Sequence, residues 1–160
     1  MSSSLFALIF FTAVACGIVG GAFFAFSTFV MKGLGRVPAA QGIVSMQSIN
    51  VEAIRARFMA ALLGAALACI AVAGVSLASW DESFAPYSLV GSVLYLVGTI
   101  LPTRAANVPR NDLLAELDPA TTQAASYWPR YLTSWTAWNH VRTAGALAAS
   151  ACLIWSIHVG

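Results

Sequence analysis

Residues 5–31 read LFALIFFTAVACGIVGGAFFAFSTFVM, an apolar stretch of 27 residues without one charged side chain. Two more uncharged apolar stretches, residues 58–80 and 83–103, are 23 and 21 residues long. A helix rises about 1.5 Å per residue, so each stretch is long enough to cross roughly 30 Å of hydrocarbon. These three stretches predict an all-α membrane protein whose natural environment is a lipid bilayer.

A fourth apolar stretch, residues 143–157, has only 15 residues and is too short to cross a bilayer by itself. It spans only if its helix begins upstream, and we therefore predict a fourth span at about residues 137–158. This extension draws Asn139, His140 and Arg142 to the membrane boundary or below it. Function is best sought there, because this is the only chemically rich cluster in a predicted span.

Composition supports the membrane assignment and excludes other classes. The chain is 59% hydrophobic and 9% charged, whereas about a quarter of the residues in soluble domains are charged. Its 160 residues predict a single domain, residues 1–160. The net charge of +2 is small and forms no basic patch, so no nucleic-acid partner is expected. The three cysteines form no C-x-x-C motif and are interpreted as buried apolar residues.

The distribution of positive charge predicts the orientation. All eight Lys and Arg residues lie in the first connection, the third connection or the start of the fourth helix, while the second connection holds only Asp81 and Glu82. The positive-inside rule then places connections one and three in the cytoplasm and both termini outside it, in the inner (cell) membrane. The predicted architecture is an antiparallel bundle of four transmembrane helices.

The cytoplasmic connections are predicted to contain short helices. Residues 41–58 lack proline and can form a helix that runs straight into the second span. In the third connection, Pro109 and Pro119 suit the first turns of helices. Within the spans, small residues recur every fourth position and allow close helix packing; they are Ala13, Gly17, Gly21 and Ala25 in the first span and Gly145 and Ala149 in the fourth.

The entrance to the fourth span carries the candidate chemistry. At about 100° per residue, Trp135, Asn139 and Thr143 share one helix face. Arg142 lies close to Trp135 and Trp138, and a guanidinium over aromatic rings gains about 0.5–2 kcal/mol. His140 points away from Arg142, on the other side of Asn139. Alternatively, Arg142 only extends to the membrane interface, and the two tryptophans form an aromatic belt.

Further polar residues gather on the same predicted side of the membrane. Asn107, Asn111 and Asp112 directly follow the third span, where helix capping and ordinary loop polarity are the alternative explanation. Gln47 and Asn50 lie on an otherwise apolar helix face, and uncharged amides in such surroundings require buried partners. No carboxylate lies at i+4 spacing from His140, so no metal site is expected.

Three motifs of the chain are Phe23-Phe24-Ala25-Phe26-Ser27, Asn107-x-Pro109-x-Asn111 and Trp135-x-x-x-Asn139-x-x-Arg142. Together with the four predicted spans, they resemble the anthrone oxygenase-like family of small membrane proteins, long classified as a domain of unknown function. The resemblance covers nearly the whole chain, and the Asn-x-x-Arg motif of the last span is its most specific part.

The resemblance implies an activity, because fungal members oxidise anthrones to anthraquinones without a cofactor. We therefore expect an oxygenase without cofactor or metal that acts on an anthrone-like or phenolic substrate. Arg142 and Asn139 suit the stabilisation of an oxyanion, and His140, with Asp112 in reserve, suits the base. The expected substrate-binding residues are Gln47, Asn50, Asn107, Asn111, Asp112, Trp135 and Trp138.

Two other functions remain open from the sequence. A non-catalytic membrane protein could use the same amides and Arg142 to bind a quinone or lipid, or could support another membrane complex. A small transporter is less consistent with the sequence, because spans one to three carry no ionisable residue at mid-membrane. The sequence leaves the natural substrate and the oligomeric state unassigned.

Overall fold

A computed structural model describes residues 1–160, except for the side chain of Ala56, and the described chain is helical without strands. Three short π-helical segments interrupt or extend the α-helices, and a π-helix is wound more widely than an α-helix. The α-helices are α1 (Ser3–Ala25), α2 (Met31–Leu34), α3 (Ala39–Ala53), α4 (Ala56–Ala78), α5 (Ala85–Tyr95), α6 (Val108–Ala115) and α7 (Thr122–Val159). The π-helical segments are η1 (Phe26–Val30), η2 (Leu96–Ile100) and η3 (Thr103–Asn107).

Three helices of the described chain are long and apolar enough to cross a membrane. They are Ser3–Leu34, Arg57–Ala78 and Ala85–Ala115, with mean hydropathies of 2.3, 2.4 and 1.4. These helices contain the three stretches predicted from the sequence almost completely, and they indicate a membrane protein. The 38-residue helix α7 is not one of the three, because residues such as His140 and Arg142 dilute its apolar half.

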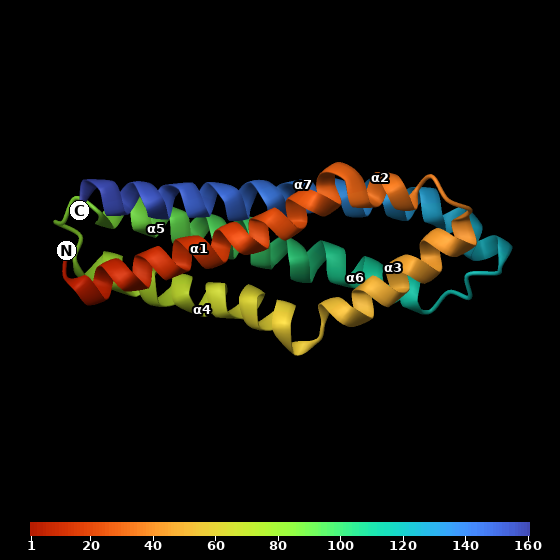
Figure 1. The fold of residues 1–160 in the computed structure, drawn as a ribbon, viewed down its shortest axis with the longest axis horizontal. Coiled ribbons are helices and arrows are strands. Elements are labelled where there is room, and N and C mark those ends of the chain that lie inside the picture. The colour runs from red at the N-terminus through yellow and green to blue at the C-terminus, as the bar shows by residue number, and fades with distance from the viewer.

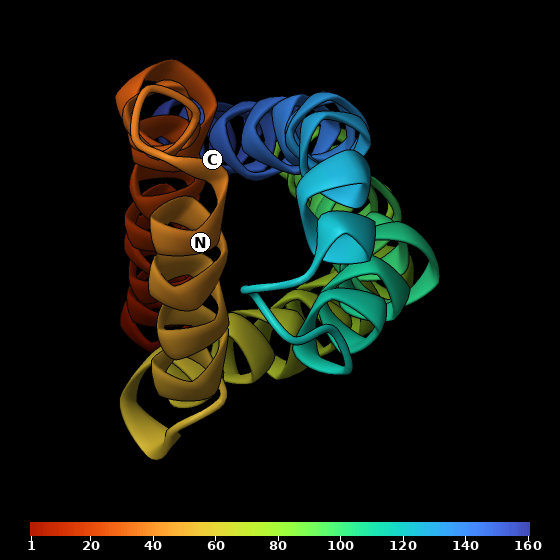
Figure 2. The ribbon, with the colours of Figure 1, turned by 90° about the vertical axis from the view of Figure 1, so that its right-hand side faces the viewer.

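The long helices lie side by side along the longest axis of the molecule (Figure 1). Both termini lie at one end, where the Met1 ammonium donates a hydrogen bond to the Gly160 carbonyl at 3.5 Å. The opposite end holds α2, α3, α6 and the start of α7. Seen from that end, α3 lies on one side, and α6 and α7 lie on the other (Figure 2).

The helices expected in the first and third connections are present as α3 and α6, with two corrections. Pro109 lies in the first turn of α6 as expected, but Pro119 lies in a turn before α7 and not in a helix. Residues 41–58 do not form one helix running into the next span, because the chain breaks between α3 and α4. Ile54 caps α3 with φ −82° and ψ −6°, and Arg55 is extended at φ −70° and ψ 158°. The break turns the chain sharply and leaves Glu52 in the last turn of α3.

Two clusters of buried side chains divide the molecule along its length. The bundle cluster lies among α1, α4, α5 and α7, and the end cluster lies among α2, α3, α6 and the first half of α7. The largest apolar members of the bundle cluster are Ile9, Val19, Phe23, Leu62, Val72, Phe84, Tyr95 and Leu153. Those of the end cluster are Met31, Ile43, Met46, Leu114, Trp128, Tyr131 and Trp135.

Small residues bring the helix backbones together, as the sequence pattern predicts. One close approach joins η2 to α7, where a Cβ on Gly145 would lie 2.7 Å from the Gly98 carbonyl carbon. Ser150 of α7 donates a hydrogen bond to the Ala13 carbonyl of α1 at 2.8 Å. By contrast, a Cβ on Gly21 would meet no neighbouring heavy atom within 4 Å. Only some of the small residues predicted at every fourth position therefore take part in close helix packing.

Candidate functional site

The three π-helical segments each place a polar side chain against the same stretch of α7. Thr99 of η2 donates to the Arg142 carbonyl at 3.2 Å, and Asn107 of η3 donates to the Trp135 carbonyl at 3.1 Å. Ser27 of η1 is hydrogen-bonded to Thr143 at 3.0 Å. Single π-helical turns inside α-helices occur frequently at functional sites. Here they contact residues 135–143 of α7 from two helices, Ser3–Leu34 and Ala85–Ala115.

Asn139 lies at the centre of this arrangement and is fully buried. Its Nδ2 donates to the Phe23 carbonyl and to Ser27 Oγ, both at 2.7 Å. Its Oδ1 accepts a hydrogen bond from Arg142 Nη2, also at 2.7 Å. Since both ends of the amide are engaged, Asn139 holds the guanidinium in one orientation.

Arg142 is enclosed by the protein rather than extended to a surface, and only 5% of it is exposed. Its Cζ lies 4.2 Å from the Phe23 ring centroid and 4.9 Å from that of Trp135, which are cation–π distances. Its Nε has no hydrogen-bond partner, and no described carboxylate forms an ion pair with it. A buried cation without a carboxylate is costly and therefore unusual in a purely structural role.

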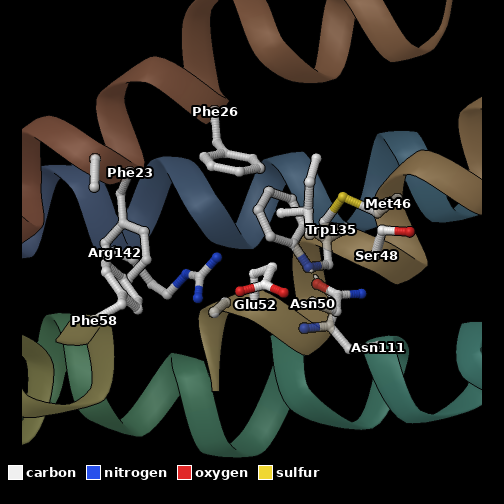
Figure 3. Close-up of a pocket in the computed structure, with 13 residues that line it drawn as sticks. Phe23, Phe26, Met46, Ser48, Asn50, Glu52, Phe58, Asn111, Trp135 and Arg142 are labelled. Atoms are coloured by element: carbon white, nitrogen blue, oxygen red, sulfur yellow. Dashed lines mark hydrogen bonds between the residues drawn. The ribbon is translucent and has the colours of Figure 1, made fainter. Parts of the chain in front are cut away.

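A cavity of about 490 Å³ adjoins the guanidinium. Its wide apolar walls include Phe23, Phe26, Phe58 and Trp135, and Figure 3 shows these rings around a smaller set of polar groups. The other lining residues are Ala22, Met46, Ser48, Ile49, Asn50, Glu52, Ala53, Asn111 and Arg142. Ligand pockets typically combine apolar and aromatic walls with a few polar groups that fix orientation.

A second buried donor at this cavity is also unpaired. Asn50 Nδ2 has no hydrogen-bond partner, like Arg142 Nε. Buried polar groups are nearly always paired in folded proteins, so two unpaired donors at one cavity call for an explanation. Both are donors, and a bound molecule that satisfies them must present oxygen or another electron-rich acceptor.

Asn111 fixes the indole that forms one wall. Its Oδ1 accepts hydrogen bonds from Tyr131 Oη at 2.9 Å and from Trp135 Nε1 at 2.8 Å. Burial raises the pKa of Tyr131 above its ordinary value, so its hydroxyl stays protonated and continues to donate. Trp135 is thereby held between this amide and the Phe26 ring, whose centroid lies 5.7 Å away.

The structure brings five of the predicted site residues together. Asn50, Asn111, Trp135 and Arg142 line the cavity, and Asn139 lies directly behind Arg142. These residues come from three separate helices, α3, α6 and α7.

The other predicted residues lie elsewhere. His140 and Asp112 are exposed, Trp138 is 41% exposed, and none of the three lines the cavity. Gln47 has a structural contact, since its Nε2 donates to the Leu114 and Leu117 carbonyls at 2.9 and 3.0 Å. Asn107 is fully buried and braces α7 without lining the cavity. The roles assigned to them remain predictions.

Sequence reasoning missed the three phenylalanine walls and one carboxylate. Phe23 and Phe26 belong to a motif noted in the first span, but their contact with Arg142 and Trp135 depends on how α1 packs on α7. Phe58 lies in an apolar stretch, where nothing in the sequence marks it as a site residue. Glu52 is the only carboxylate among the lining residues. In the sequence it does not differ from any other charged residue of a connection.

Comparison with known proteins identifies one family. A family model described as anthrone oxygenase matches residues 51–152. The match covers α4, α5, α6 and most of α7, and it includes Glu52, Asn111, Asn139 and Arg142. The chain matches no curated protein and no solved structure.

Proposed function

The chain belongs to the anthrone oxygenase family, and on this premise we propose that it is an integral membrane oxygenase that converts an anthrone-like or phenolic aromatic substrate to a quinone. One observation carries the proposal: Arg142 Nε and Asn50 Nδ2 are unpaired donors at an aromatic-walled cavity. A planar polycyclic substrate fits such walls, and a carbonyl or phenolate oxygen supplies the acceptors that these donors lack.

The chemistry follows from the acidity of an anthrone. Removal of one methylene proton gives an anion whose charge lies mainly on the carbonyl oxygen, and this electron-rich anion reacts with O₂. One oxygen atom becomes the new carbonyl, and the other leaves as water with the two methylene hydrogens. The methylene carbon loses four electrons and O₂ gains four, so we propose that no cofactor takes part.

Arg142 supplies the main stabilisation in this proposal. Preorganised donors in a site shielded from water stabilise a developing oxyanion strongly. The Asn139 amide keeps the guanidinium in place through the 2.7 Å hydrogen bond, which makes Asn139 a positioning residue. The rings of Phe23 and Trp135 exclude water around the charge.

We further propose that α7 is the fourth span of an antiparallel bundle, with about residues 137–158 in the bilayer. Both termini then lie outside the cytoplasm of a cell whose inner membrane holds the protein. The distribution of Lys and Arg and the shared end of the two termini support this arrangement. A reporter active only in the periplasm, fused after Gly160, should be active. Cytoplasmic reporter activity at that position would refute the orientation.

The activity is tested with membranes that contain the overproduced protein. Addition of anthrone should accelerate oxygen consumption and quinone absorbance over membranes from cells lacking the protein. A chelator should leave the rate unchanged. No acceleration over the control membranes would reject the enzyme.

The same donors also favour a second candidate, a non-catalytic protein that binds a quinone or a lipid or supports another membrane complex. A quinone carbonyl is as good an acceptor for Arg142 and Asn50 as a phenolate oxygen. Retention of a coloured quinone through purification, without oxygen consumption on any anthrone or hydroquinone, would establish this function instead.

A further inference from the structure

The cavity contains a carboxylate to which the sequence assigns no role. Glu52 lines the cavity from α3, and no other lining residue carries a carboxylate. In Figure 3 its carboxylate points into the space between the Arg142 guanidinium and the amides of Asn50 and Asn111. The single acid thus faces the single cation across the place that a substrate would occupy.

The position of Glu52 is unfavourable for the stability of α3. It lies in the last turn of the helix, where the partial charge of the helix end is negative and a carboxylate is repelled. Its ion-pair partner, Arg55 Nη1, lies 3.0 Å from Oε1, but the two side chains are 63% and 70% exposed. An exposed pair of this kind is weak, so the carboxylate can exchange Arg55 for another partner at little cost.

Its exposure also allows Glu52 to release a proton to water after it has acted as a base. A proton taken from a substrate inside the cavity must reach water before the next turnover. Glu52 borders both the cavity and the solvent. His140 and Asp112, the bases expected from the sequence, are exposed but do not line the cavity.

We propose that Glu52 is the general base of the reaction, an inference that rests on the proposed oxygenase function. A carboxylate oxygen of Glu52 forms an O–H bond to one methylene proton of the substrate, and the C–H bond breaks. Its electron pair moves through the ring to the carbonyl oxygen, which becomes the oxyanion that Arg142 stabilises. Water at the open side of the cavity then takes the proton from Glu52.

The test compares Glu52→Gln with the wild-type protein in membranes. Glutamine keeps the size and the hydrogen-bonding oxygen of glutamate but cannot accept the proton. General bases contribute about 10²–10⁴-fold, and anthrone turnover should fall by that order. Glu116→Gln, an exposed residue at the end of α6 outside the cavity, is the matched control and should keep the wild-type rate.

The pH dependence of the Glu52→Gln rate shows whether Glu52 acts as a base or only as a counter-charge for Arg142. The charged groups facing Glu52 are Arg55 and Arg142, and the Tyr131 phenol lies beside Asn111. Above the pKa of the free anthrone, the substrate ionises in water and no longer needs a base. The Glu52→Gln rate should therefore approach the wild-type rate at high pH, and binding of the unreactive quinone product should be unchanged at all pH values.

Four outcomes decide the assignment. A large loss at neutral pH that recovers at high pH supports Glu52 as the base. A loss that persists at high pH, or weaker quinone binding, shows a counter-charge for Arg142 and overturns the proposal. Equal rates for wild type and Glu52→Gln also overturn it but leave the oxygenase intact, whereas an inactive wild-type protein rejects both.

Discussion

The bundle cluster and the end cluster treat buried polar groups in opposite ways. In the bundle, Tyr95 donates to the Leu62 carbonyl at 3.1 Å, and Ser76 and Ser88 share a hydrogen bond of 2.7 Å. The buried side-chain atoms that lack partners in the described chain are Asn50 Nδ2, Asn107 Oδ1 and Arg142 Nε. Arg142 lies against the Trp135 ring, Asn107 donates to the Trp135 carbonyl, and Asn50 lines the same cavity as Trp135. These unpaired groups therefore lie beside the end cluster, whereas the buried polar groups named in the bundle are paired.

The two regions also differ in how they fill space. In the bundle, helices meet backbone to backbone, as at Gly98 and Gly145. At the other end, rings of α7 fill the space: the Trp128 and Tyr131 centroids lie 5.5 Å from each other at an interplanar angle of 13°, and a Cβ on Gly42 of α3 would lie 2.8 Å from the Trp128 ring. The cavity beside Arg142 lies where these two kinds of packing meet, since its walls include Phe23 of the bundle cluster and Trp135 of the end cluster.

Among the changes that test this contrast between the two regions, the largest effect is expected at Arg142. Loss of one oxyanion donor typically costs about 10²–10³-fold in turnover, and Arg142→Ala should lower the anthrone oxidation rate by that order. Arg142→Lys should also lower it strongly, because an ammonium cannot replace the planar guanidinium held by Asn139. Oxygen consumption measures both variants.

The control for these variants is Arg130→Lys, an exposed change on the same helix, which should retain full activity. If Arg142→Lys kept wild-type turnover, melting temperature and quinone retention, Arg142 would be an interfacial anchor, and the contrast between the two regions would disappear.

The next largest effect, on the melting temperature, is expected in the bundle at Gly145. A methyl group on Gly145 would lie 2.7 Å from backbone atoms of Gly98, and backbone cannot turn aside as a side chain can. Overpacking of this kind typically costs about 1–3 kcal/mol, so Gly145→Ala should lower the melting temperature in detergent. Gly64→Ala, with no neighbouring heavy atom within 4 Å of the added carbon, should not. Equal melting temperatures would show that η2 and α7 do not touch.

A smaller difference in stability is expected between variants of two buried hydrogen-bonding residues, Asn139 and Ser150. Asn139→Ala removes the partner of a buried guanidinium, and an unsatisfied buried group costs about 1–3 kcal/mol. Ser150→Ala removes a single bond to the Ala13 carbonyl, and such bonds between membrane helices average about 0.6 kcal/mol. Thermal unfolding of both variants should rank Asn139→Ala below Ser150→Ala. The reverse order would place the critical polar contacts in the bundle.

The sequence predicts the helices well because length and hydropathy alone decide them. The stretches at residues 5–31 and 58–80 lie almost wholly within Ser3–Leu34 and Arg57–Ala78. The π-helical segments were not predictable, since a wider turn needs no particular composition. The break at Ile54 and Arg55 was missed for a related reason: neither residue is a glycine or a proline.

The site was predictable where it lies on one helix and not where it depends on contacts between helices. Helical spacing correctly placed Trp135, Asn139 and Thr143 on one buried face. It paired Arg142 with both Trp135 and Trp138, yet the second ring beside the guanidinium is Phe23 from α1. Glu52 lines the cavity from the last turn of α3, and its place there depends on how α3 packs against other helices, which the sequence pattern does not reveal.

The smallest effect is expected at the histidine that the sequence favours as the base. His140 is exposed and lies outside the cavity, and surface substitutions usually change stability by no more than about 0.5 kcal/mol. His140→Ala should therefore keep the melting temperature and the anthrone oxidation rate of the wild type, including the dependence of that rate on pH. A fall of about 10²–10⁴-fold would instead identify His140 as the base. The reaction would then take place on the outer face of α7, and the unpaired donors at the cavity would need another ligand.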